Sequence, residues 1–135
     1  MVVRSVYCSS MKKEWQEAIQ CGDCEKVRNL LENGVEIDSL DEYGQTALMN
    51  AARRGDLDLI QLLIKQGAAL NHTAKYRLTA LMLAVINSNA DIVRVLIKAG
   101  ANVELGGSKP FNSTPLEYAE DHGLDEIATI LKNRT

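Results

Sequence analysis

The sequence has few of the residues on which enzymatic and nucleic-acid-binding sites depend. Only two of its 135 residues are histidines, and it contains no nucleophile elbow, glycine-rich phosphate loop or H-E-x-x-H motif. The net charge of −3 is opposite in sign to that of a general phosphate-backbone binder, which needs a concentrated basic face. We therefore expect neither independent catalysis nor nucleic-acid binding.

Long apolar runs and a secretory signal are also missing. No stretch approaches the roughly 20 apolar residues that are needed to span a bilayer. The first ten residues, MVVRSVYCSS, contain one arginine and no sustained apolar core, so they do not read as a signal peptide. The cysteine count, three, is odd and favours a reducing compartment. We expect a cytoplasmic protein without a membrane segment, in which residues 1–10 form an N-terminal arm that packs on the following domain through Val3, Val6 and Tyr7.

What the chain does contain is a phrase that repeats at a fixed spacing. Gly34, Gly67 and Gly100 lie 33 residues apart. They occupy matching positions within the similar segments LLENGVEID, LLIKQGAALN and VLIKAGANVE. Thr46 and Thr79 open TALMNAARRGDLDLIQLL and TALMLAVINSNADIVRVL, and TPLEYAEDHGLDEIATIL opens 35 residues later. A period in this range indicates a stacked repeat protein.

Each repeat predicts a pair of helices separated by a glycine. In the second repeat a short helix carries Leu48, Ala51 and Ala52 and breaks at Gly55. A longer helix follows and stops at Gly67. Its apolar positions are Leu59, Ile60, Leu62, Leu63 and Ile64. One such pair cannot bury both of its faces alone, so neighbouring pairs must stack and the outermost pairs must turn polar faces to water.

The phrase that begins at Gly44 resembles the ankyrin repeat. It reads Gly44-x-Thr46-Ala47-Leu48-x-x-Ala51-Ala52-x-x-Gly55-Asp56, followed by Leu62-Leu63-x-x-x-Gly67-Ala68-x-x-Asn71. The resemblance covers residues 11–135 and implies an all-α solenoid of stacked helix-turn-helix units with projecting β-turns. We divide this domain into an N-cap repeat (11–38), two inner repeats (39–71 and 72–104) and a C-cap repeat (105–135).

Polar residues replace apolar ones at both ends of the predicted array. Asn29 stands where the inner repeats have Leu62 and Val95. Near the other end, Glu120 and Lys132 occupy positions that are apolar in the inner repeats. Because terminal repeats need a polar outer face, we expect these two repeats to be caps and the array to be complete.

Two departures from the family pattern bear on the fold. The Thr-Pro-Leu-His motif is Thr-Ala-Leu-Met at 46–49 and 79–82. In the family that histidine hydrogen-bonds along the stack, so Met49 and Met82 must pack instead and the polar ladder between repeats is in question. Arg77 replaces the turn glycine, Gly44, of the preceding repeat. A positive φ at a non-glycine residue costs about 1 kcal/mol or more, so that turn is either reshaped or held by contacts.

The resemblance implies a binding module that does no chemistry of its own and needs no cofactor. Partners of such repeats usually occupy the concave face, which is built from the turn tips and the outward positions of the first helices. The corresponding residues here are Glu42, Tyr43, Gln45, Arg53, Arg54, Lys75, Tyr76, Leu78, Ile86, Asn87, Lys109 and Phe111. We predict an adaptor or scaffold. An inhibitor or regulatory subunit that occludes an enzyme such as a protein kinase would use the same face and stays open.

Aromatic residues recur at one position of the predicted turn tips. Tyr43, Tyr76 and Phe111 fill it in three successive repeats. Either they anchor a partner as interface hot spots, or each ring packs on the adjacent turn and stiffens the stack; both alternatives stay open. The positive residues of this face are Arg53, Arg54, Lys75, Arg77 and Lys109, and the negative ones are Asp41, Glu42 and Asp121. This excess favours a partner with an acidic surface. We expect a monomer rather than a homo-oligomer, and self-association through Tyr43, Tyr76, Phe111 and Ile86 stays open.

A C-x-x-C motif spans Cys21 to Cys24. Near a helix start this spacing lowers a thiol pKa in redox proteins. In the repeat register, however, Cys24 aligns with Leu57 and Ala90 at the start of the second helix, where a small packed residue is expected. With Cys8 the thiols still fall short of four zinc ligands, and both histidines lie far along the stack. We expect no metal site and keep a thiol redox sensor using Cys21 and Cys24 as an alternative.

Overall fold

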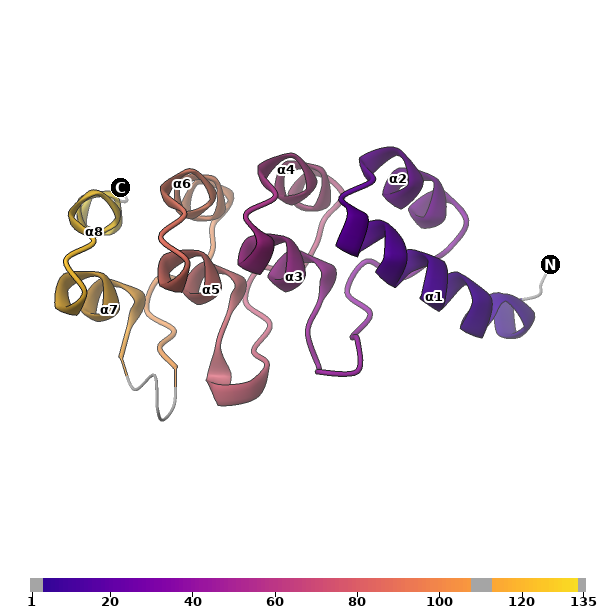
Figure 1. Cartoon of the computed structure of the whole chain (residues 1–135), viewed down its shortest axis with the longest axis horizontal. Coiled ribbons are helices and arrows are strands. Elements are labelled where there is room, and N and C mark those ends of the chain that lie inside the picture. Colours follow the sequence, from indigo (N-terminus) through magenta and orange to yellow (C-terminus); the bar gives the residue numbers. More distant parts are fainter. Residues whose placement is uncertain (1–3, 108–112, 134–135) are drawn as a thin grey trace.

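The helices stack in two rows, as expected for an all-α solenoid. The computed structural model describes residues 4–107 and 113–133, with side chains from residue 12 onward. These residues form α1 (Arg4–Cys21), α2 (Cys24–Glu32), α3 (Ala47–Arg54), α4 (Leu57–Lys65), α5 (Ala80–Ile86), α6 (Ala90–Ala99), α7 (Pro115–Asp121) and α8 (Asp125–Lys132), and no strand. Figure 1 shows the odd-numbered and even-numbered helices in separate rows, with the turns projecting from one side. The predicted fold class is confirmed.

The first helix is longer than the sequence division suggested. α1 begins at Arg4, so residues 4–10, which we assigned to an arm, run without a break into the first helix of the N-cap repeat. Figure 1 shows this helix extending past α2 at the N-terminal end. The packing expected of Val3, Val6 and Tyr7 lies outside the described side chains. Within the described ranges, no helix has both the length and the hydropathy that a membrane crossing requires.

Threonine caps start the first helices of successive repeats. The side chains of Thr46 and Thr79 are buried, and each accepts a hydrogen bond from the backbone N–H three residues later. Thr114 and Glu117 form a reciprocal capping box at the start of α7. Gly55 ends α3 in the left-handed conformation, with a φ of 78°. The helix boundaries therefore follow from local chemistry that the sequence displays.

The core is a continuous apolar strip between the two rows. Each odd-numbered helix contacts the next odd-numbered one, and the even-numbered helices do the same. Met49 and Met82 lie in this strip with 1% and 0% of their surface exposed. Their flexible thioether side chains fill the position of the family histidine. The prediction that these methionines pack is confirmed.

The two ends of the array differ from its centre in polarity, as predicted. Asn29 on α2 is exposed, whereas Leu62 in the equivalent position on α4 is buried. Glu120 and Lys132 are exposed at the C-terminal end, where their side chains form an ion pair of 3.1 Å. These residues give α2, α7 and α8 polar outer surfaces that face water.

Polar side chains connect successive repeats without the missing histidine. Asp38 Oδ1 accepts a hydrogen bond from the backbone N–H of Ala69 at 2.9 Å. One repeat later, Asn71 Oδ1 accepts from the backbone N–H of Asn102 at 2.8 Å. Asp38 and Asn71 occupy the same repeat position. A polar ladder therefore exists, but it lies in the loops after the second helices and uses Asp38 and Asn71, for which we had predicted no such role.

Candidate protein-binding face

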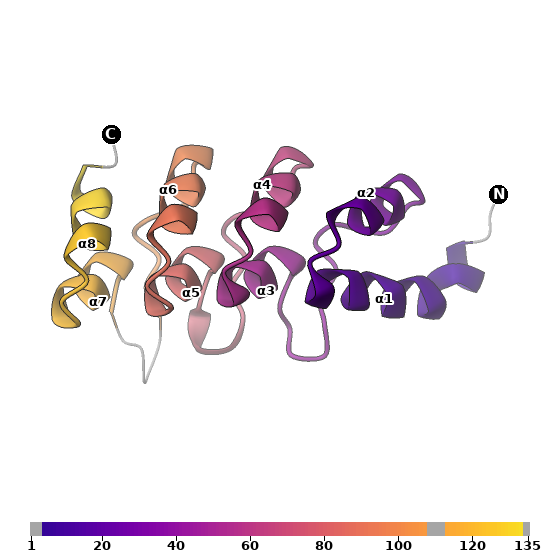
Figure 2. The ribbon, with the colours of Figure 1, turned by 45° about the horizontal axis from the view of Figure 1, so that its top comes forward.

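The turns and the first helices share one side of the molecule. In Figures 1 and 2 the turns after α2 and α4 project beyond α3 and α5 on this side. We call this surface the turn-side face and define it by the turns at 41–45 and 74–78, the exposed residues of α3 and α7, and Ile86 and Asn87 at the end of α5. It corresponds to the face that the family resemblance implied.

Asp41 organises the turn of the second repeat. Its Oδ1 accepts hydrogen bonds from the backbone N–H groups of Tyr43 at 2.8 Å and Gln45 at 2.9 Å. Its Oδ2 accepts from Asn50 Nδ2 at 3.0 Å, which ties the turn to α3. Gly44 completes the turn with a φ of 75°. The backbone N–H groups of Tyr43, Gly44 and Gln45 therefore all have acceptors within the turn, and Asn50 ties the turn to α3.

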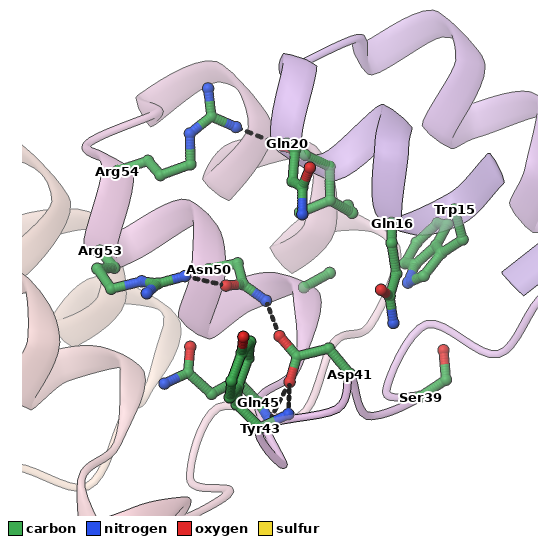
Figure 3. A pocket seen from close by; sticks show the side chains of 12 residues that line it. Trp15, Gln16, Gln20, Ser39, Asp41, Tyr43, Gln45, Asn50, Arg53 and Arg54 are labelled. Carbon is green, nitrogen blue, oxygen red and sulfur yellow. Dashed lines mark hydrogen bonds between the residues drawn. The ribbon is translucent and has the colours of Figure 1, made fainter. Parts of the chain in front are cut away.

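The charge of Asp41 is stabilised in place. Burial by itself would raise the pKa of its carboxyl group, but hydrogen bonds from Asn50, Gln45 and Tyr43, together with the positive charge of Arg53, hold that pKa below its usual value. Arg53 Nη2 in turn donates to Asn50 Oδ1. Figure 3 shows the resulting chain of side chains from Asp41 through Asn50 to Arg53. From the sequence we had counted Asp41 only as one of the negative charges of this face. Its position at the start of a turn that contains Tyr43 and Gly44 could have indicated its role in stabilising that turn.

The second-repeat turn presents its aromatic residue to solvent. Tyr43 is 70% exposed at the tip, and the neighbouring Glu42 is exposed as well. Leu40, which precedes the turn, is 42% exposed and was not identified from the sequence. An exposed ring on a turn with a fixed backbone loses little conformational freedom when it binds.

The third-repeat turn is built differently. Ala74 stands at the position of Asp41 and brings no side-chain acceptor, and Arg77 replaces Gly44. The segment Lys75–Arg77 forms a short 3-10 turn in which Tyr76 and Arg77 both have a positive φ, of 64° and 57°. Arg77 N–H donates to Ala74 O at 2.9 Å, as Gly44 N–H donates to Asp41 O at 3.0 Å. Of the two outcomes left open, the positive φ is therefore kept at Arg77 and held by backbone contacts, and the turn changes shape only at Tyr76. Left-handed backbone at two non-glycine residues costs about 1 kcal/mol or more each.

Two predicted binding residues make contacts within the fold. Leu78 is only 8% exposed and anchors the base of the third-repeat turn in the core, so its assignment as a tip residue that meets a partner was wrong. Arg54 is exposed, but its Nη1 donates to the backbone oxygen of Ile19, in the last turn of α1, at 2.6 Å. The family pattern predicts on which face of the stack a residue lies. It does not predict which atoms the side chain of that residue contacts.

The remaining predicted residues divide by exposure. Lys75 is exposed, and Tyr76 is 39% exposed. Ile86 is half-buried against the core, so it offers less apolar surface than we expected, while Asn87 is exposed and its Nδ2 donates to Leu83 O at 3.0 Å. Lys109 and Phe111 lie outside the described residues. Two of the three aromatic residues of the predicted column are therefore shown to reach solvent.

A hollow of about 80 Å³ separates α1 from the second repeat. Trp15 and Gln16 of α1 line one side, and Tyr43 and Gln45 line the other (Figure 3). Gln45 Oε1 is buried there without a hydrogen-bond partner among the described residues. The sequence reasoning missed the contribution of α1, because the N-cap repeat lacks a β-turn phrase of its own in the repeat pattern.

Two thiols, those of Cys21 and Cys24, lie in the part of the chain whose side chains are described. Cys21 is exposed, Cys24 is half-buried, and both are free. Burial, together with the carboxylates of Asp56 and Asp58, raises the pKa of the Cys24 thiol. The fraction of thiolate is therefore below that of an ordinary cysteine, which weakens the redox alternative. In the described part of the chain, no cluster of three or more His, Cys, Asp or Glu residues could hold a metal ion.

Comparison with known proteins agrees with this architecture. A family model described as ankyrin repeats (3 copies) matches residues 15–107 and 77–135. No curated protein matches the chain.

Proposed function

Since the chain belongs to the ankyrin-repeat family, whose members are generally protein-interaction modules, we propose that it is a non-enzymatic adaptor or scaffold that binds a partner protein through the turn-side face. The observation that carries this proposal is Tyr43. Its ring is 70% exposed on a turn that Asp41 holds rigid through two backbone N–H groups and Asn50. Rigid, exposed aromatic residues are typical anchors of protein interfaces.

The charge of this face supports an acidic partner surface. Arg53, Lys75 and Arg77 are exposed on it, and the negative charge of Asp41 is already engaged by hydrogen bonds and by Arg53. Glu42, Glu117 and Asp121 are exposed acids of the same face and Glu120 pairs with Lys132, so the positive excess is confined to α3 and the turn at 74–78. Charge complementarity of this kind raises the rate and selectivity of encounter more than the affinity, so capture of the partner should weaken as salt rises.

The test is an affinity pull-down from the native cell lysate with the full chain as bait. Wild type is compared with a Tyr43→Ala, Tyr76→Ala variant and with a matched control, Gln61→Ala, Lys98→Ala. The control residues are exposed on α4 and α6, in the other row of helices. Circular dichroism checks that both variants fold. A partner captured by wild type and control but lost by the tyrosine variant supports the proposal. A partner retained by all three baits moves binding to another surface.

The identity of the captured partner decides between two roles of the same face. If the partner is an enzyme, its activity is measured on stoichiometric addition of the full chain. Unchanged activity supports an adaptor, and loss of activity assigns an inhibitor or regulatory subunit. The odd number of cysteines supports placing this interaction in a reducing, cytoplasmic setting. We propose a monomer as the binding form.

A further inference from the structure

The tip of the third repeat keeps backbone strain that its neighbour avoids. Tyr76 and Arg77 have φ values of 64° and 57°, in the region that favours glycine. In the second repeat the position of Arg77 is occupied by Gly44, and Asp41 supports the turn with hydrogen bonds. A turn of this length can therefore be built in this fold without strained non-glycine residues. Strain that the fold does not need is characteristic of functional segments.

The same tip has a distinct chemistry. It reads Lys75-Tyr76-Arg77, a ring between two cations, where the second repeat has Glu42-Tyr43-Gly44. Both cationic side chains are exposed, and Lys75 Nζ lies 5.1 Å from the centre of the Tyr76 ring. Within the described residues, the side chains of Lys75 and Arg77 take part in no hydrogen bond or ion pair. Their donors are available to a partner.

The arginines of the neighbouring first helix differ in this respect. Arg54 donates to Ile19 O at 2.6 Å, and Arg53 donates to Asn50, which is itself bonded to Asp41. Their guanidinium groups serve contacts within the fold. All four arginine and lysine side chains keep their positive charge, but in the described part of this face only those of Lys75 and Arg77, at the third-repeat tip, have no hydrogen bond or ion pair within the fold.

We propose that this tip recognises an acidic side chain of the partner protein, with Arg77 as a specificity-determining residue that is retained at the expense of fold stability. The carboxylate would lie between Lys75 and Arg77 at the edge of the Tyr76 ring. This inference rests on the proposed binding function of the turn-side face. A carboxylate is the partner group that this tip favours, because it can accept charge-assisted hydrogen bonds from Lys75 and Arg77. A basic side chain would be repelled by the two positive charges, and an apolar one would leave their donors without acceptors.

The experiment uses a displayed library of random peptides selected on the full wild-type chain. Enriched peptides are synthesised with a fluorescent label and titrated with wild type, Arg77→Gly and Arg77→Lys. Lys98→Ala, which removes an exposed cation from α6, is the control for net charge. Tyr43→Ala and Tyr76→Ala are titrated with the same peptides. Urea unfolding is measured for wild type, Arg77→Gly, Arg77→Lys and Lys98→Ala. Each peptide is also made with its acidic residues replaced by the corresponding amides.

Opposite changes in binding and stability are expected for Arg77→Gly. It should weaken peptide binding by at least about tenfold and raise the urea midpoint, because glycine adopts the left-handed backbone without strain. Arg77→Lys and Lys98→Ala should bind within about twofold of wild type. The amide peptides should lose binding to wild type and show little further loss with Arg77→Gly.

Other results overturn the inference in distinguishable ways. If Arg77→Gly binds as well as wild type while Tyr43→Ala does not, the turn-side face binds the peptide but the tip does not recognise an acid. Enriched peptides without acidic residues, a lowered urea midpoint for Arg77→Gly, or failure to enrich related peptides each reject the inference as well. Insensitivity to Tyr43→Ala, Tyr76→Ala and Arg77→Gly together would also contradict the proposed function.

Discussion

Arg54 on α3 donates a hydrogen bond of 2.6 Å to the backbone oxygen of Ile19, across a sequence separation of 35 residues. Ile19 lies in the last turn of α1, and its carbonyl oxygen also accepts a hydrogen bond from the backbone N–H of Gly22 at 3.2 Å. The guanidinium group gives this carbonyl a second donor and places a positive charge at the negative end of the helix dipole. This contact fastens the N-cap repeat to the first inner repeat.

Replacement of Arg54 should loosen that attachment. Arg54→Ala removes a charge-assisted hydrogen bond at a partly buried acceptor, and we expect a loss of about 1 kcal/mol in the free energy of unfolding. Hydrogen exchange should show faster opening of α1 and α2 than of α5 and α6, because repeats unfold partly independently. Lys98→Ala serves as the control, since Lys98 is exposed on α6. Equal stability of Arg54→Ala and wild type in urea would show that the contact has no net effect.

The low pKa of Asp41 predicts a pH-dependent contribution to stability. The folded pKa lies below the ordinary value of 3.8, so the carboxylate stabilises the fold fully above that value and loses its effect as the pH falls through the folded pKa. At neutral pH, Asp41→Asn should be less stable than wild type by about 1 kcal/mol, a figure discounted for partial solvent screening. Urea unfolding of both proteins is measured at neutral pH and at about pH 3. The difference should shrink in acid; a constant difference would contradict the role of the charge.

The inter-repeat ladder predicts a modest but specific effect at Asn71. Asn71→Ala removes the acceptor for the backbone N–H of Asn102 and should cost about 1 kcal/mol of unfolding free energy. Asp38→Ala should behave similarly at the preceding interface. Gln61→Ala, an exposed substitution on α4, provides the comparison in thermal or urea unfolding. Ladder variants as stable as Gln61→Ala would show that water replaces these bonds without loss.

We expect that mild oxidation does not form a disulfide between Cys21 and Cys24. Because the raised pKa of Cys24 lowers its thiolate fraction, mass spectrometry should detect no Cys21–Cys24 disulfide. Alkylation at neutral pH should modify the exposed Cys21 faster than the half-buried Cys24. Rapid and complete formation of that disulfide would restore the redox-sensor alternative.

Much of the fold could be predicted because its determinants are local and recur with the repeat. Thr46 and Thr79 cap helices through bonds that span three residues, and Gly55 ends a helix through its own backbone freedom. The apolar spacing identified the helices and their stacking. Met49 and Met82 were expected in the core because their register position left no alternative, and both are buried there.

The binding face was predicted less completely, because bonding between distant segments does not follow from register. The repeat position of Leu78 indicated a tip, but its side chain turns into the core, since the apolar strip of the stack offers it burial. The repeat position of Arg54 indicated a side chain free to bind a partner, but in the folded chain α1 brings Ile19 O within hydrogen-bond distance of it. The sequence alone determined that repeats of this kind stack and which positions form their turns. Only the tertiary structure decided which cations are engaged within the fold, because that depends on contacts between segments that the chain brings together when it stacks. It also showed that Tyr76 and Arg77 both have a positive φ, in a turn whose backbone hydrogen bonds, among the described residues, lie within residues 74–78.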